Sequence, residues 1–182
     1  AVAAGDRILV LELLSNGASI LENKRSLSPL YPIAQRGDVE LLKILILHGG
    51  SVNSRFKNDT PLLIAAFHGH TEIVRVLLNE NAEIDPIGST GVTPLFLACQ
   101  EGFYKIAKEL IIKKANVNFC TTDDVTPLIM AVNNQHEKLV QLLIDNGANI
   151  NHIATNITAL GLAVRHGNLD LVKILVTNGA DL

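Results

Sequence analysis

Tryptophan is absent from this chain of 182 residues, and aromatic residues together make up only 4% of it. Because 48% of the residues are nevertheless hydrophobic, the core must be built from leucine, isoleucine, valine and alanine, which suits small, regularly packed helices. Only two cysteines are present, Cys99 and Cys120, which is too few for a disulfide framework. We expect two free thiols, with Cys99 buried in a helix and Cys120 in a loop.

Neither sign of charge dominates, since 15 lysines and arginines stand against 18 aspartates and glutamates. With no run of basic residues, the chain is not expected to bind nucleic acid or an anionic membrane surface. No stretch approaches the roughly 20 apolar residues that a membrane-spanning helix needs. The segment Ala1-Val2-Ala3-Ala4 lacks the basic flank of a signal peptide. We therefore expect a cytoplasmic protein, with the nucleus as the alternative compartment.

One tripeptide recurs along the chain at a nearly constant spacing. Thr-Pro-Leu begins at Thr60, Thr93 and Thr126, and weaker copies begin one period away at Ser28 and Thr158. Self-similarity at a period of about 33 residues is typical of a solenoid of stacked repeats.

Each period contains the signals for two short helices. Thr60 can cap the first helix with its hydroxyl, and Pro61 suits the first helical position. Gly69 should end that helix in a left-handed conformation. The second helix carries apolar residues at helical spacing and should end at Asn81, because asparagine tolerates that conformation. A pair of short helices cannot bury its apolar face alone, so neighbouring pairs must stack.

These patterns resemble the ankyrin repeat family over essentially the whole chain. The strings that carry the resemblance are Thr60-Pro61-Leu62 with Ala65-Ala66, Gly69-His70-Thr71-Glu72-Ile73-Val74, and Asn146-Gly147-Ala148-Asn149-Ile150-Asn151. The resemblance implies an all-α solenoid of helix-turn-helix units with short β-hairpin fingers. We expect a single domain over 1–182, divided into a partial repeat 1–27, repeats 28–59, 60–92, 93–125 and 126–157, and a repeat 158–182 that lacks its following finger.

Several positions depart from the family pattern. The family's histidine after Thr-Pro-Leu is missing from every copy, so we expect more reliance on apolar packing between repeats. Lys114 and Gln135 replace glycines at helix ends. Pro32 should remove a helical hydrogen bond and distort the repeat that begins at Ser28. Because the pattern is cut at both ends, we expect the chain to be a segment of a longer protein.

No constellation predicts catalysis or a resident cofactor. A nucleophile elbow, a phosphate-binding glycine loop and a Ser/His/Asp pattern are all missing from the sequence, so we expect no enzyme. His68 and His70 lack the spacing of a helical metal pair. We interpret His70 and His136 as structural and Asp123-Asp124 as a solvated finger turn, and we expect no metal site.

The resemblance implies that a partner protein or peptide binds on the concave surface made by first helices and finger tips. Phe56 and Phe67 stand out there as aromatic anchors, although Phe56 could equally fold onto an adjacent finger. The predicted binding residues are Gln35, Arg36, Phe56, Lys57, Phe67, His68, Ser89, Thr90, Gln100, Glu101, Thr122, Asp123, Asn133, Asn134, Arg165 and His166.

The predicted function is a protein–protein interaction scaffold. The alternative is a structural or autoregulatory array within a larger enzyme, channel or secreted effector, where docking to further domains replaces an external partner. Ile8, Leu11 and Leu47 are relevant to this choice, because they occupy second-helix positions that are usually charged in the family. They either form an interface or are ordinary scattered surface residues.

Overall fold

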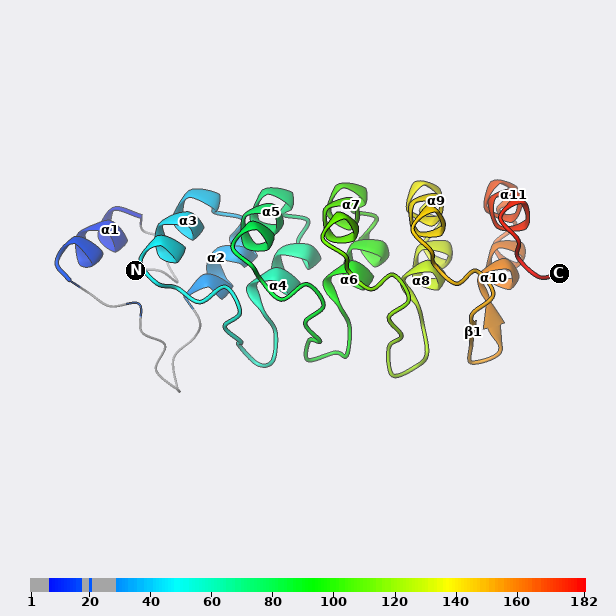
Figure 1. Cartoon of the computed structure of the whole chain (residues 1–182), viewed down its shortest axis with the longest axis horizontal. Coiled ribbons are helices and arrows are strands. Elements are labelled where there is room, and N and C mark those ends of the chain that lie inside the picture. The colour runs from blue at the N-terminus through cyan, green and yellow to red at the C-terminus, as the bar shows by residue number, and fades with distance from the viewer. Residues whose placement is uncertain (1–6, 18–19, 21–28) are drawn as a thin grey trace. The chain divides into compact units, whose positions relative to one another are not determined.

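The computed structural model describes residues 7–17, 20 and 29–182 as pairs of short helices joined by loops (Figure 1). Residues up to Ser89 form one compact unit and those from Thr90 form another. The first unit holds α1 (Arg7–Ser15), α2 (Leu30–Arg36), α3 (Val39–Leu47), α4 (Pro61–Phe67) and α5 (Thr71–Asn79). The second holds α6 (Pro94–Glu101), α7 (Tyr104–Ile112), α8 (Pro127–Asn133), α9 (Glu137–Asp145), β1 (Ile153–Ala154), β2 (Ile157–Thr158), α10 (Ala159–Arg165) and α11 (Leu169–Thr177).

Within each unit the helices stack in two rows, as predicted for a solenoid. In the first unit α2 packs on α4 and α3 packs on α5. In the second unit α6, α8 and α10 form one row and α7, α9 and α11 the other (Figure 1). The core lies between the rows and consists of aliphatic side chains with no exposed surface, such as Leu95, Ile106 and Leu110. The expectation of an aliphatic core built from small helices is confirmed.

The recurring threonines begin the first helices as predicted. Thr60, Thr93 and Thr126 have extended backbones, and each hydroxyl accepts a hydrogen bond from the N–H three residues later, with a proline following at the first helical position. Thr158 caps α10 in the same way without a proline. Because three of these threonines are almost fully buried, their hydroxyls satisfy N–H groups that water could not reach.

The distortion predicted at Pro32 is not found in α2, which is a continuous helix of seven residues like α4 and α8. Pro32 lies in the first turn, where the N–H groups have no helical partner in any case, so its missing N–H costs no helical bond. Pro29 stands at the cap position with helical dihedrals and offers no side-chain cap. Ser28, where a weaker copy of the tripeptide begins, lies outside the described residues.

The partial repeat 1–27 is described over α1, whose first residue is tied to α3. The Arg7 guanidinium donates from Nε and Nη2 to the two carboxylate oxygens of Asp38, at 2.9 and 2.6 Å. Asp38 also caps α3 by accepting from the N–H of Leu41. Partial burial acts to raise the pKa of Asp38, but the hydrogen bonds from Arg7 and Leu41, together with the charges of Arg7 and Arg36, outweigh it and lower that pKa. Asp38 therefore serves two helices with one carboxylate.

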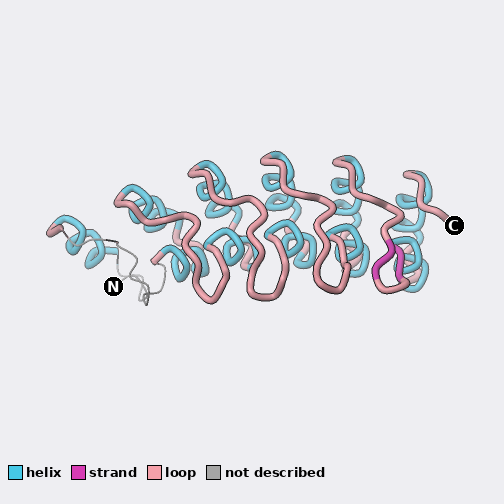
Figure 2. Tube along the Cα trace, turned by 60° about the horizontal axis from the view of Figure 1, so that its bottom comes forward, coloured by secondary structure: helices cyan, strands magenta, loops and turns pink. Residues whose placement is uncertain are grey.

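The loops between repeats project as fingers from the first-helix row (Figure 2). β1 and β2 form an antiparallel hairpin, with Ile153 opposite Thr158 and Ala154 opposite Ile157. In the first unit a single bridge pairs Phe56 with Asp59. Among the described residues, paired strands are thus found in the finger before α10, and the remaining fingers are turns.

Helix ends confirm the left-handed positions that the sequence indicates. Asn81, Lys114 and Gln135 have φ of 61°, 73° and 60°. The side chains of Lys114 and Gln135 are sterically strained in this conformation, whereas glycine is not.

Replacing Lys114 by glycine should raise the free energy of unfolding by about 1 kcal/mol, because glycine removes the Cβ contact that disfavours the left-handed conformation. Urea unfolding followed by circular dichroism measures the change. Lys113→Gly is the matched control, since Lys113 has φ of −83° and should lose stability instead. A Lys114→Gly variant that is no more stable than the parent contradicts the prediction.

Candidate functional site

The predicted binding residues of the first helices lie on the last turn of each helix. In the first unit Gln35, Arg36, Phe67 and His68 are all exposed. Phe67 leaves 44% of its surface exposed and meets only the edge of the neighbouring His68 ring in an aromatic contact, at 5.1 Å between centroids. A partner can bury this exposed ring without having to replace hydrogen bonds to water, because the phenylalanine side chain has no polar group.

The equivalent residues of the second unit are partly engaged with one another. Glu101, Asn133, Arg165 and His166 are exposed, whereas Gln100 and Asn134 are half-buried. The Asn134 amide donates to the backbone carbonyl of Gln100 at 2.7 Å. The Asn134 side chain therefore joins α8 to α6, which leaves less of it for a partner than at the other positions.

Finger residues also divide into engaged and exposed groups. Phe56 is half-buried and packs edge-to-face against Tyr31 of α2, with 4.9 Å between ring centroids. The Lys57 ammonium lies over the Phe56 ring, 5.5 Å from its centroid. Burial, and to a lesser extent the charge of Asp59, raises the pKa of Tyr31. Phe56 thus packs within its own unit, on a helix rather than on the adjacent finger that we considered.

Ser89 is held by its neighbouring finger. Its N–H and its hydroxyl donate to the carboxylate of Asp59, at 2.8 and 3.2 Å. Thr90, Thr122 and Asp123 are exposed at finger positions of the second unit. The predicted set is therefore brought to the surface in both units, with Phe56, Ser89 and Asn134 committed to contacts inside the fold.

The histidines that open the second helices connect successive repeats. His70 Nε2 lies 3.0 Å from the carbonyl oxygen of Gln35, and His136 Nε2 lies 3.3 Å from that of Gln100. Each contact joins a histidine to the preceding repeat, which confirms the structural interpretation of these residues. Although the family's histidine after Thr-Pro-Leu is missing, side-chain hydrogen bonds between repeats are thus made from a different position.

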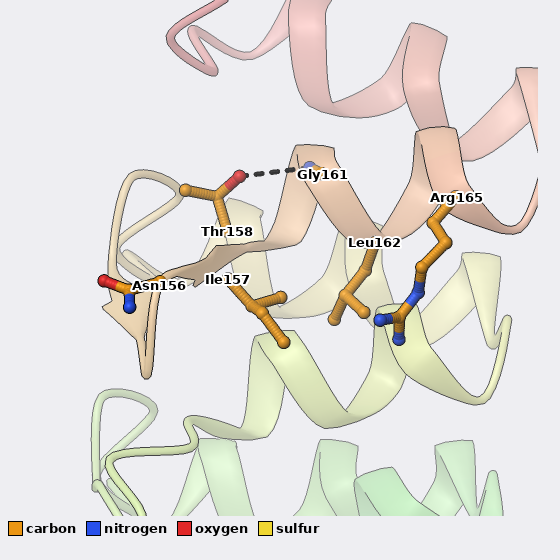
Figure 3. Close-up of a pocket in the computed structure, with 6 residues that line it drawn as sticks. All are labelled: Asn156, Ile157, Thr158, Gly161, Leu162 and Arg165. Carbon is orange, nitrogen blue, oxygen red and sulfur yellow. Dashed lines mark hydrogen bonds between the residues drawn. The ribbon is translucent and has the colours of Figure 1, made fainter.

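A groove of about 250 Å³ lies beside α10 and is lined by Asn156, Ile157, Thr158, Gly161, Leu162 and Arg165 (Figure 3). Gly161 is one of the lining residues, and the corresponding positions of earlier repeats carry Leu63, Phe96 and Ile129, whose side chains are buried. The groove combines an apolar wall with one guanidinium.

A group of three potential ligands lies at the base of two fingers of the second unit. The ligand atoms of Cys120, Asp124 and His152 lie within 4.8 Å of one another. Burial, followed by the hydrogen bond and the charge of Asp124, raises the pKa of the Cys120 thiol. We interpreted Asp124 only as part of a solvated turn, and it is indeed exposed with φ of 61°. The signal that we missed is the spacing: Cys120 and Asp124 flank one finger turn, and His152 follows Cys120 by one period.

Apolar side chains are exposed on second helices of both units. Ile8 is 80% exposed, Leu11 46%, Leu47 83% and Ile112 60%. Ile8, Leu11 and Leu47 are thus exposed, in keeping with second-helix positions that are usually charged in the family, and both interpretations given for them stay open. Within the described ranges, no helix has both the length and the apolar content needed to cross a bilayer.

Stacked pairs of short helices, threonine-proline helix starts and projecting fingers define a helical repeat array. The model of the ankyrin repeats family matches three overlapping stretches, residues 1–87, 30–121 and 95–182. The chain belongs to the ankyrin repeat family. No curated protein matches the sequence. Ankyrin repeats are in general protein–protein interaction modules.

Proposed function

We propose that this chain is a non-enzymatic interaction module of the cytoplasm or nucleus that binds a partner protein or peptide through its first-helix ends and finger tips. The observation that carries the proposal is the exposure of side chains at the same place in successive repeats, the pairs Gln35-Arg36, Phe67-His68 and Arg165-His166 among them. Helices fix these positions, so a partner meets a preformed surface and pays little ordering entropy.

The groove beside α10 suggests the chemistry of one contact. Ile157 and Leu162 can bury an apolar side chain, and Arg165 can pair with a carboxylate placed beside it. Figure 3 shows Ile157, Leu162 and Arg165 pointing to the same side of α10 and its finger. A peptide with an acidic residue next to an aliphatic one fits this lining best.

Removal of the Phe67 ring should weaken partner binding by at least about tenfold, since central aromatic anchors contribute about 2 kcal/mol or more to an interface. Peptides are selected from a displayed random library on the intact chain, and their affinities are then measured on Phe67→Ala, Arg165→Ala and the parent. Tyr104→Ala is the matched control, because Tyr104 is also exposed (39%) but lies on a second helix.

The expected result is that the selected peptides bind Phe67→Ala at least about tenfold more weakly than the parent and bind Tyr104→Ala like the parent. Selection of no peptide, or equal binding to all variants, contradicts the proposal. Enrichment of acidic-aliphatic pairs that depend on Arg165 supports the assignment of the groove.

A second candidate function is an array that docks onto further protein of the same polypeptide. The exposure of Ile8 and Leu47, at 80% and 83%, favours it, because such side chains are commonly covered when several lie on one surface. Hydrogen exchange distinguishes the two functions. If further protein of a longer polypeptide docks on the array, the amides of α1 and α3 should exchange more slowly in that polypeptide than in the isolated chain, and in a free module the two rates should be equal.

A further inference from the structure

We propose that Cys120, Asp124 and His152 form a binding site for Zn²⁺ that joins two consecutive fingers of the second unit. The three residues offer a thiol, a carboxylate and an imidazole, which are the three ligand types that Zn²⁺ takes from proteins. The mixture of sulfur and nitrogen ligands disfavours Ca²⁺ and Mg²⁺, which prefer oxygen alone.

The distances between the ligand atoms match those around a tetrahedral zinc ion. Cys120 Sγ lies 3.8 Å from His152 Nε2, and Asp124 Oδ1 lies 3.3 Å from the same nitrogen. With Zn–S of about 2.3 Å and Zn–N or Zn–O of about 2.0–2.1 Å, tetrahedral angles give S···N of about 3.6 Å and N···O of about 3.3 Å. Two of the three distances are therefore close to the required geometry before any ion enters, and the three ligand atoms all lie within 4.8 Å of one another.

The fold holds the two fingers in this register. The turn after Cys120 is closed by hydrogen bonds from the Asp124 N–H to the Thr121 carbonyl and from the Thr121 N–H to the Val125 carbonyl. The side chain of Asn118 then links the fingers, since it donates to the Gly147 carbonyl and accepts from the Asn149 N–H, at 2.9 and 2.7 Å. One set of bonds fixes the turn that carries Cys120 and Asp124, and the other holds this finger against the segment that leads to His152. Backbone hydrogen bonds therefore fix the segments that carry the three ligands.

The same geometry argues against a cysteine nucleophile served by a histidine–aspartate pair. Such a relay needs the cysteine on one ring nitrogen and the carboxylate on the other. Here both Cys120 Sγ and Asp124 Oδ1 face Nε2 of His152. Because the thiol and the carboxylate meet at one ring nitrogen, the three side chains can act as ligands of a single ion once the Nε2 proton has moved.

Metal binding requires two proton shifts, and they balance. The Cys120 thiol releases its proton to solvent and binds as a thiolate. In the metal-free chain Nε2–H of His152 donates to the Asp124 carbonyl oxygen at 2.8 Å. On metal binding this proton moves to Nδ1 through solvent, the hydrogen bond is given up, and the Nε2 lone pair binds the ion. The thiolate and the carboxylate together neutralise the charge of Zn²⁺. Three protein ligands leave a fourth position for water.

Metal binding by the metal-free chain is the test. Zn²⁺ is titrated against a chromophoric chelator, and Co²⁺ is added separately as a spectroscopic probe. We expect one Zn²⁺ per chain, a thiolate-to-cobalt charge-transfer band in the near ultraviolet, and the strong visible bands of four-coordinate Co²⁺. Cys120→Ser should abolish the charge-transfer band, and Cys120→Ser, His152→Gln and Asp124→Asn should each weaken Zn²⁺ binding by at least about tenfold.

Two matched controls separate this site from general surface binding. Asp123→Asn alters the exposed carboxylate next to Asp124, and His166→Gln alters an exposed histidine of the same unit; both should bind Zn²⁺ like the parent. Circular dichroism verifies that every variant is folded. Zn²⁺ that binds the parent no more tightly than Cys120→Ser and His152→Gln, or a Co²⁺ spectrum without the charge-transfer band, overturns the proposal.

Discussion

Leu128→Ala should lower the free energy of unfolding by about 3 kcal/mol, the typical loss when a fully buried leucine is truncated and its cavity is only partly refilled. Leu128 is 1% exposed. It lies in α8, which contacts α6, α9 and α10, so the cavity would open at the centre of the second unit. Urea unfolding of the parent and the variant, followed by circular dichroism, measures the difference.

Val164→Ala is the control for this experiment. Val164 lies in the adjacent helix α10 and is 62% exposed, so its truncation removes little buried surface and should change stability by less than about 0.5 kcal/mol. Equal losses in the two variants would show that the tight packing around Leu128 does not support the unit. The comparison therefore tests whether stability comes from the aliphatic core that the composition predicts.

The fold could be predicted from the sequence because its determinants are local and repeated. A threonine that caps a helix and a proline that begins it act within four residues, and each recurs in successive periods. Left-handed positions such as Asn81, Lys114 and Gln135 are also visible, since aligned repeats show glycine or asparagine there. One helix pair, once interpreted, predicts the others.

The contacts between repeats were harder to predict, because they join residues far apart in the sequence, 35 and 36 positions in the case of the two histidines. The bonds of His70 and His136 to carbonyl oxygens of the preceding repeat depend on how neighbouring units stack. The groove beside α10 is similarly a property of packing, since its lining residues come from both the finger and the helix. The glycine at position 161 is visible in the aligned repeats, but the open space beside it is not.

The group of Cys120, Asp124 and His152 shows a different limit. Searches for metal ligands look for short spacings within one segment, such as two residues one helical turn apart. In a solenoid, residues one period apart are neighbours in space, so ligands can be separated by 32 positions and still converge. The period that identifies the fold is thus also the spacing at which binding groups should be sought.

Gly102 has two reasons to be glycine, and only one of them is visible in the sequence. Its φ of 80° is left-handed, as expected between two helices. In addition, a Cβ placed on Gly102 would lie 2.6 Å from Cε1 of His136, the residue that bonds to the carbonyl of Gln100. Any side chain at Gly102 must therefore displace the histidine that joins the start of α9 to α6.

Gly102→Ala should accordingly lower the free energy of unfolding by about 2–3 kcal/mol, of which about 1 kcal/mol is the strain of alanine in a left-handed conformation and the rest is the lost histidine contact. Gly167→Ala isolates the first part. Gly167 stands at the same turn with φ of 66°, and a Cβ there would meet nothing within 4 Å. Its alanine variant should lose only about 1 kcal/mol in the same urea experiment.

A double-mutant cycle with His136→Ala completes the argument. If the histidine contact causes the additional loss, Gly102→Ala and His136→Ala should be non-additive, because the clash disappears with the ring. Gly167→Ala and His136→Ala should be additive. Equal losses for the two glycine variants, or additivity in both cycles, would mean that the helix turn alone requires glycine and that the bond from His136 to Gln100 adds nothing to the stability of the stack.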